Sequence, residues 1–113
     1  MAIQRREHAE FWLQEAFKRQ MQGDLDKAVE LYRKSIEVHA MPEAHTFLGW
    51  TFSFLGRLQD AIDECHKAIA LDPAYGNPHN DIGAYLIELG RADVRSEPQG
   101  SVGVEGDLPN RRP

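Results

Sequence analysis

Apolar residues recur at helical spacing in successive segments of the chain. Over residues 42–55 the repeating face reads His45, Leu48, Gly49, Phe52 and Leu55, and over 58–69 it reads Leu58, Ala61, Ile62, Cys65, Ala68 and Ile69. Spacings of three and four residues keep one face of an α-helix apolar, so each segment predicts a helix. The same periodicity predicts helices from about Glu7 to Gln22, over 25–36 and over 77–89. The expected fold class is therefore all-α, with five helices.

These helices fall into a repeat with a period of 33 to 34 residues. The phrase that begins at Gly23-Asp24-Leu25 returns at Gly56-Arg57-Leu58, and its first residues return at Gly90-Arg91-Ala92. A glycine at each of these positions suits the positive φ that ends one helix and turns the chain into the next. Pro42 and Pro78 stand at first helical turns, where a missing N–H costs little. Each period therefore predicts a helical hairpin.

The three phased copies resemble the tetratricopeptide repeat (TPR) family, whose motif reads W-x₂-L-G-x₂-Y, then A-x₃-F, then P. The second copy matches it at Leu48-Gly49, Phe52, Ala61, Ala68 and Pro73, with His45 in place of the tryptophan and Cys65 in place of the later aromatic. The first copy supplies Trp12, Ala28 and Tyr32, and the third supplies Ile82-Gly83. The resemblance implies a right-handed α-α superhelix, a TPR-like solenoid of about two and a half helical hairpins. Its domain is expected over residues 7–92, with repeats at about 9–41, 42–75 and 76–92, the last incomplete.

Small residues occupy equivalent places in the three copies. Ala16, Gly49 and Gly83 stand on the first helix of each unit, where a missing side chain lets a second helix approach closely. We expect a large residue at Gly49 to separate the two helices of its hairpin.

Residues 42–55 carry a second apolar stripe, which the hairpin itself does not require. In the TPR family the first helices of successive repeats line a concave groove for peptides, and the stripe corresponds to that lining. The residues expected to form the peptide groove are Phe17, Met21, Phe47, Trp50, Phe54, Asn77, Asn80 and Asp81. Such a groove is aromatic in its first two repeats and polar to acidic in the third, which suits an apolar peptide with a basic end. The alternative is that Phe17, Phe47 and Trp50 are buried against one another.

Many TPR domains that dock heat-shock chaperones hold a C-terminal carboxylate in a clamp of Lys, Arg and Asn. Here the corresponding positions carry Leu13, Phe17, Phe47, Asn77 and Asp81. A negative charge stands where a positive one is needed, so we expect no such ligand.

Charge and composition exclude several other classes. The net charge is -5 with a pI near 5.5, and Lys and Arg are scattered among acids, so no nucleic-acid partner is expected. The sequence has no run of 18 apolar residues and no secretory signal, which predicts no membrane partner and a cytoplasmic location. The histidines lack metal-ligand spacing, and the lone Cys65 lies on an apolar stripe. We therefore expect no cofactor, no metal and no enzymatic activity, but a scaffold that binds a protein or peptide of unknown identity.

The repeat pattern stops after Asp93, and residues 93–113 contain Gly, Pro and mixed charges without a helical period. This segment is expected to be a disordered tail. Leu86 and Leu89 are then left without a hairpin partner. Two hypotheses remain open: the chain is a truncated or frameshifted copy of a longer array, or it forms a homodimer through the uncapped C-terminal helix. The alternative function is a structural or self-associating fragment with no ligand of its own.

Overall fold

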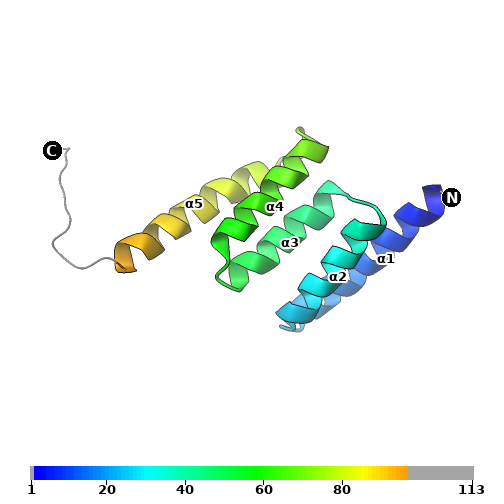
Figure 1. The fold of residues 1–113 in the computed structure, drawn as a ribbon, viewed down its shortest axis with the longest axis horizontal. Coiled ribbons are helices and arrows are strands. Elements are labelled where there is room, and N and C mark those ends of the chain that lie inside the picture. Colours follow the sequence, from blue (N-terminus) through cyan, green and yellow to red (C-terminus); the bar gives the residue numbers. More distant parts are fainter. Residues whose placement is uncertain (1, 97–113) are drawn as a thin grey trace.

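A computed structural model describes residues 2–96, which form five α-helices and contain no β-strand (Figure 1). The helices are α1 (Ala2–Met21), α2 (Leu25–Val38), α3 (Pro42–Phe54), α4 (Leu58–Leu71) and α5 (Asn77–Ser96). The all-α prediction is confirmed. Residues 97–113, which hold most of the predicted disordered tail, lie outside the described part of the chain.

Two predicted helix boundaries are wrong. Helix α1 begins at Ala2 and not near Glu7. The prediction missed its first turns because they are polar and show no apolar periodicity. In the structure, Arg5 holds these turns in place by donating two hydrogen bonds to the Val38 carbonyl. Helix α5 continues through Gly90 to Ser96, so the first residues of the predicted tail, 93–96, are helical. Glycine weakens a helix without stopping it, and the next proline in the sequence is Pro98.

The turns inside the two complete hairpins are formed as expected. Gly23 and Gly56 have φ values of 84° and 78°, in the left-handed region that favours glycine. The Asp24 carboxylate caps α2 by accepting from the Lys27 backbone N–H. Pro42 opens α3 directly after an extended residue, Met41.

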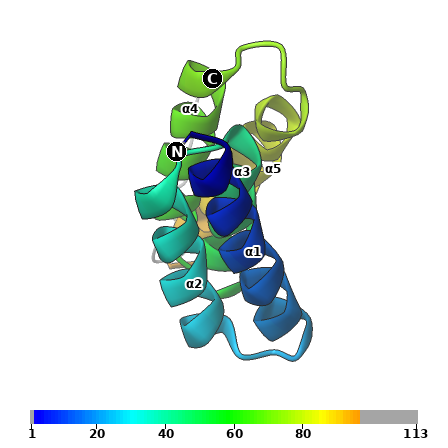
Figure 2. The ribbon, with the colours of Figure 1, turned by 90° about the vertical axis from the view of Figure 1, so that its right-hand side faces the viewer.

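The helices form two layers, with α1, α3 and α5 in one and α2 and α4 in the other (Figure 2). Within the hairpins α1 packs on α2 and α3 on α4, and α2 and α4 each also contact the first helix of the following unit. The first helices of all three units therefore share one side of the molecule.

The core lies between the layers. Its buried members come from all five helices and include Ala16, Ala28, Val29, Tyr32, Leu48, Phe52, Ala61, Ile62, Cys65 and Tyr85. Two buried hydrogen bonds hold α1 to α2: the Tyr32 hydroxyl donates to Gln20 Oε1 at 2.6 Å, and Ser35 Oγ donates to the Ala9 carbonyl at 2.6 Å. They fix the rotation of α1 and hence the direction of its groove side chains.

The prediction that small residues permit close packing is confirmed at Gly49. A Cβ atom there would lie 3.0 Å from the Ala61 carbonyl oxygen on α4. It is wrong at Gly83, where a Cβ would meet nothing within 4 Å, because among residues 2–96 no sixth helix packs on α5. For the same reason Leu86 is 53% exposed. Leu89 was expected to lack a partner too, but it packs against the core because it follows Tyr85 by one turn.

Candidate functional site

Four aromatic side chains form a continuous row across α1 and α3. The ring centroids of Phe17 and Phe47 are 5.9 Å apart, those of Phe47 and Trp50 are 6.5 Å apart, and those of Trp50 and Phe54 are 5.2 Å apart. These separations are typical of attractive aromatic pairs. The buried ring of Tyr32, 6.2 Å from Phe47, supports the row from α2. The structure thus brings together aromatic residues that sequence analysis placed on two separate helices.

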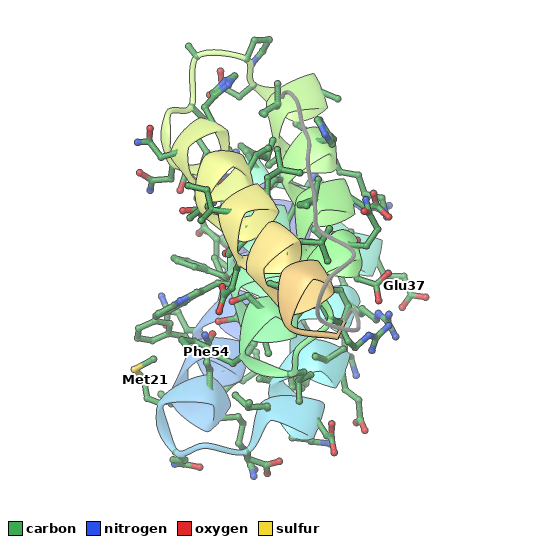
Figure 3. All side chains as sticks on the ribbon, turned by 90° about the vertical axis from the view of Figure 1, so that its left-hand side faces the viewer. Met21, Glu37 and Phe54 are labelled. Atoms are coloured by element: carbon green, nitrogen blue, oxygen red, sulfur yellow. The ribbon has the colours of Figure 1, made fainter. Side chains whose placement is uncertain are left out.

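Exposure differs along this aromatic row. Phe47 and Trp50 are half-buried, while Phe17 is 39% exposed and Phe54 is 56% exposed. Mutual burial, the alternative raised from the sequence, therefore accounts for only part of the surface of the row. Exposed Met21 lies on the same side as Phe54, and Glu37 of α2 lies on the opposite side (Figure 3). The first-helix layer consequently presents an apolar surface to solvent.

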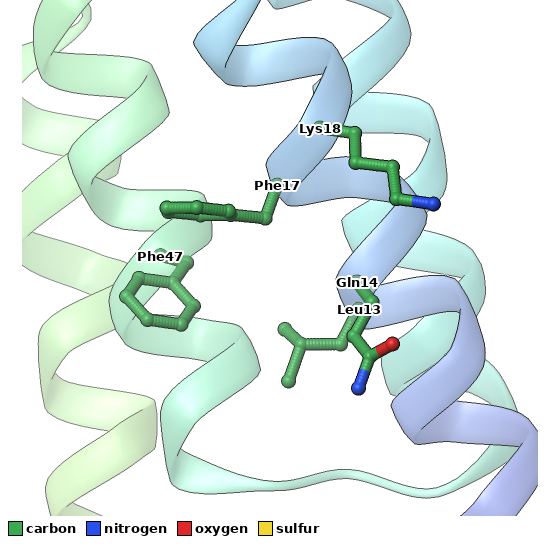
Figure 4. Close-up of a pocket in the computed structure, with 5 residues that line it drawn as sticks. All are labelled: Leu13, Gln14, Phe17, Lys18 and Phe47. Carbon is green, nitrogen blue, oxygen red and sulfur yellow. The ribbon is translucent and has the colours of Figure 1, made fainter.

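A cleft of about 390 Å³ separates α1 from α3. It is lined by Leu13, Gln14, Phe17, Lys18 and Phe47 (Figure 4). Phe17 points from α1 towards Phe47, whereas the ammonium of Lys18 points away from both rings. That ammonium lies 3.0 Å from Glu15 Oε2. The interior of the α1–α3 cleft is thus almost entirely apolar.

A smaller cleft of about 170 Å³ lies between α3 and α5. Its lining residues are Thr46, Phe47, Trp50, Asn77 and Asp81. Asp81 is half-buried, and burial raises the pKa of its carboxyl group. The Thr46 hydroxyl donates to the Pro42 carbonyl of its own helix at 2.8 Å. Charge in the α3–α5 cleft therefore comes from Asp81.

The expected groove residues are not all equivalent in the structure. Phe17, Phe47, Trp50, Asn77 and Asp81 line one or both clefts. Met21, Phe54 and Asn80 are exposed outside the two clefts. The latter three could meet only a ligand that extends beyond the clefts.

The α2 and α4 side of the molecule holds a buried pair that sequence analysis missed. His45 Nδ1 lies 2.7 Å from Glu64 Oε1, and Lys67 donates to the other carboxylate oxygen at 2.9 Å. Burial opposes ionisation of Glu64, but the hydrogen bonds and charges of His45 and Lys67 outweigh it and lower the pKa of Glu64. The sequence does contain a signal for this buried pair. Glu64 stands three residues after Ala61 and four before Ala68, which places a charged residue on the inner face of its helix.

Other chemistry finds little support in the described residues. They contain no group of three His, Cys, Asp or Glu side chains able to hold a metal ion. Cys65 is fully buried, and burial, with smaller contributions from Asp81 and Glu64, raises the pKa of its thiol to about 12. Such a thiol is a poor nucleophile at neutral pH. Within residues 2–96, every helix is too short or too polar to cross a membrane.

Known proteins resemble this chain in sequence and in fold. A family model described as tetratricopeptide repeat matches residues 42–75. Heat shock protein STI1 of Saccharomyces cerevisiae is 29% identical over 72 residues, which cover 62% of this chain and 12% of STI1. Small glutamine-rich tetratricopeptide repeat-containing protein 2 of Mycosarcoma maydis is 32% identical over 88 residues, covering 77% of this chain and 25% of that protein. The chain therefore spans a quarter or less of the length of these relatives.

A solved structure shows the same fold. The second TPR of Spaghetti (RPAP3), bound to the HSP90 peptide SRMEEVD, superposes with a TM-score of 0.73 at 20% sequence identity. The match covers 81% of this chain and 86% of that chain. The hairpin stack predicted from the repeat is thereby confirmed as a TPR-like solenoid.

Proposed function

Because this chain belongs to the tetratricopeptide-repeat family, we propose that it is an interaction module that binds a peptide or a helix in the groove along α1, α3 and α5. The observation that carries the proposal is the aromatic row of Phe17, Phe47, Trp50 and Phe54. This row keeps exposed apolar surface in the free protein, beside a cleft of about 390 Å³. The natural occupant is an apolar side chain of the ligand.

The energetics of such a site suit the binding of a peptide with modest affinity. Rigid aromatic side chains offer a large contact area at a low cost in conformational entropy, which is why they are frequent at the centres of interfaces. Full burial of one apolar ligand side chain contributes about 1.5 to 3 kcal/mol. That range corresponds to an affinity gain of roughly ten- to a hundredfold for each anchor residue.

The charges of the groove favour a ligand without an acidic end. The Spaghetti domain was solved with a peptide that ends in Glu-Glu-Val-Asp. In this chain Lys18 already pairs with Glu15 and points away from the cleft, and the α3–α5 cleft carries Asp81. A peptide with a negative end would be repelled by Asp81, so we propose a different class of ligand.

The groove supports binding better than catalysis. Among the residues that line the two clefts, only Lys18 and Asp81 carry ionisable side chains, and they lie in different clefts. General acid–base or nucleophilic chemistry requires two such groups within hydrogen-bonding reach of one substrate atom. We therefore propose a non-enzymatic role.

The proposal can be tested by selecting binders from a phage library of random 12-residue peptides. Selected peptides are then synthesised, and their affinities are measured by fluorescence anisotropy for the parent chain, Phe17→Ala and Phe11→Ala. Phe11 is the matched control because it is 53% exposed on the same helix, packs on Trp12 and lines neither cleft. Circular dichroism verifies that both variants remain helical.

We expect Phe17→Ala to weaken binding about tenfold or more and Phe11→Ala to change it less than twofold. A Trp12→Phe background leaves Trp50 as the only tryptophan, so a change in its emission on binding reports directly on the groove. Failure to select any peptide, or equal losses in the two alanine variants, would contradict binding in the groove.

A second candidate function, self-association, is favoured by a face of α5 that no other described helix covers. Gly83, Leu86, Ile87 and Gly90 share this face, and Leu86 and Ile87 are both exposed. In the second hairpin the equivalent face of α3 receives α4 against Gly49. Two copies of α5 in antiparallel contact would seat the large residues of one copy against the glycines of the other. The proposed occupant is therefore a second copy of the chain.

Light scattering coupled to size exclusion tests this second candidate between about 5 and 500 µM. We expect a concentration-dependent dimer that Leu86→Glu abolishes and that Ala84→Glu, on the groove side of α5, leaves intact. A monomer across the whole range, or equal effects of the two substitutions, would remove self-association from consideration.

A further inference from the structure

The α3–α5 cleft contains an acidic group without a partner. Among residues 4–90, whose side chains the structure describes, Asp81 makes no ion pair and no side-chain hydrogen bond, although its carboxylate is half-buried beside Trp50 and Asn77. By contrast, Glu15 on α1 and Glu30 on α2 each pair with a lysine three residues away on the same helix. Partial burial without an internal partner disfavours the charged form of this carboxylate, and a cation supplied from outside the chain would offset that cost.

The walls of this cleft are suited to a long cationic side chain. Trp50 and Phe47 supply ring surface, and Thr46 completes a narrow space of about 170 Å³, less than half the volume of the α1–α3 cleft. Lysine and arginine bury an apolar stem and keep the charged end near solvent or an acid. A cation over an indole ring is also attracted by the negative face of the ring.

We infer that the α3–α5 cleft binds a lysine or arginine side chain of the peptide, with its stem against Phe47 and Trp50 and its cation paired with Asp81. This inference rests on the proposed function, since it assigns the charge of a ligand held in the same groove. Asn77, an exposed residue that also lines the cleft, can pair with a peptide amide or carbonyl of that ligand.

The amino-terminal end of α5 does not favour an anion in the α3–α5 cleft in place of the lysine or arginine side chain. The amino-terminal end of a helix carries a partial positive charge that attracts anions. Here the helix begins at Asn77, and Asp81, about one turn inside, already provides a negative charge at that end. An acidic ligand group would have to approach Asp81 at short range, which is unfavourable.

The two clefts set the spacing between the ligand residues. Phe47 lines both clefts, so the apolar residue and the basic residue bind on either side of one ring. Neighbouring helices in a layer lie about 8 to 10 Å apart, and an extended chain advances about 3.3 Å per residue. An extended ligand therefore carries its lysine or arginine about three residues from its apolar anchor.

The experiment compares phage pools selected on the parent chain, Asp81→Asn and Asp81→Lys, with Asp26→Asn as a control for loss of one negative charge. Asp26 is exposed on α2, in the layer opposite the groove. We expect the parent and the control to enrich lysine or arginine about three residues from an apolar residue. Asp81→Asn should lose this enrichment, and Asp81→Lys should favour glutamate or aspartate there.

A single peptide from the parent pool then gives the magnitude. Replacement of its lysine by glutamine should weaken binding to the parent about fivefold and leave binding to Asp81→Asn unchanged, as expected for one ion pair and one cation–ring contact. If Phe17→Ala abolishes binding but the lysine can be replaced freely, the groove function stands and this inference is wrong. If Asp81→Asn weakens the glutamine peptide as much as the lysine peptide, Asp81 acts on the fold and the inference is also wrong.

Discussion

His45 of α3 and Glu64 of α4 form a buried pair, with Nδ1 and Oε1 only 2.7 Å apart and both side chains 10% exposed. The repeat consensus has tryptophan at the position of His45, so a polar contact here replaces apolar packing between the two helices of the second hairpin. Lys67 completes the contact from the solvent side at 2.9 Å. The pair therefore contributes to holding α3 in place, and with it the aromatic row.

We expect Glu64→Gln to lower the free energy of unfolding by about 2 kcal/mol at pH 7, because charged hydrogen bonds at a buried site are lost. Urea unfolding followed by circular dichroism measures the loss. The control is Glu30→Gln, whose exposed pair with Lys27 contributes less than about 0.5 kcal/mol. Equal effects of the two substitutions would show that burial of the His45–Glu64 pair does not increase its contribution to the free energy of unfolding.

The same pair predicts how stability depends on pH. The pKa of Glu64 is lowered in the folded state, so its stabilising contribution is present above the unfolded-state value of about 4.3 and is lost as the pH falls through the folded value. The difference in unfolding free energy between the parent and Glu64→Gln should therefore shrink as the pH falls below about 4. A difference that does not shrink below about pH 4 would contradict the assignment.

Gly49 and Gly83 occupy equivalent repeat positions but should respond oppositely to alanine. At Gly49 the new Cβ meets the Ala61 carbonyl oxygen at 3.0 Å, so α4 must shift, and we expect a loss of about 1 kcal/mol in unfolding free energy. At Gly83 the space is open, so the better helix propensity of alanine should add about 0.5 to 1 kcal/mol. Chemical denaturation of both variants measures the two signs, and a gain at Gly49 would refute close packing there.

Cys65 offers a probe of opening between α4 and its neighbours. Its thiol is fully buried and its pKa is raised to about 12, so both access and ionisation oppose alkylation. We expect iodoacetamide to react with the native chain more than a hundredfold more slowly than with the chain in about 6 M urea, as followed by mass spectrometry. Rapid labelling of the native chain would show that the core opens far more readily than its packing indicates.

Binding of a lysine-containing peptide should weaken in mild acid. Burial raises the pKa of Asp81, so this carboxylate is protonated at a higher pH than an ordinary aspartate and then no longer attracts a cation. The nearby titratable groups are Cys65 on α4 and Tyr85 on α5; both have pKa values raised to about 12 and stay neutral in this range. Anisotropy titrations from about pH 7 to 4 should show the loss with the parent and not with Asp81→Asn.

The repeat period made most of the fold predictable. Apolar stripes at helical spacing gave five helices, and Gly23 and Gly56 marked the turns at which the structure shows positive φ. Gly90 was misleading because a glycine after an apolar stripe ends a helix only if tertiary contacts bend the chain away. The polar first turns of α1 were missed because a search for apolar periodicity cannot detect helical turns that have few apolar residues.

The aromatic part of the candidate site was predictable, and its finer geometry was not. Phe47, Trp50 and Phe54 share a face through simple helical spacing, and the repeat places Phe17 beside them. Which of these residues enclose a cleft depends on the distance and rotation between α1, α3 and α5. Those quantities depend on contacts such as Tyr32 with Gln20 and His45 with Glu64, which link residues 12 and 19 positions apart and follow no repeat rule.

The position of Phe47 as the common wall of both clefts has a thermodynamic consequence. A ligand side chain that enters one cleft fixes the rotamer of this ring, and the neighbouring cleft is then already shaped for its own occupant. Binding in one cleft thus affects binding in the other. A double-mutant cycle between the apolar anchor and the basic residue of the ligand should therefore give a coupling energy different from zero. Phe47→Leu keeps apolar bulk but removes the flat ring. This variant should still bind the ligand but show no coupling energy between the two ligand residues.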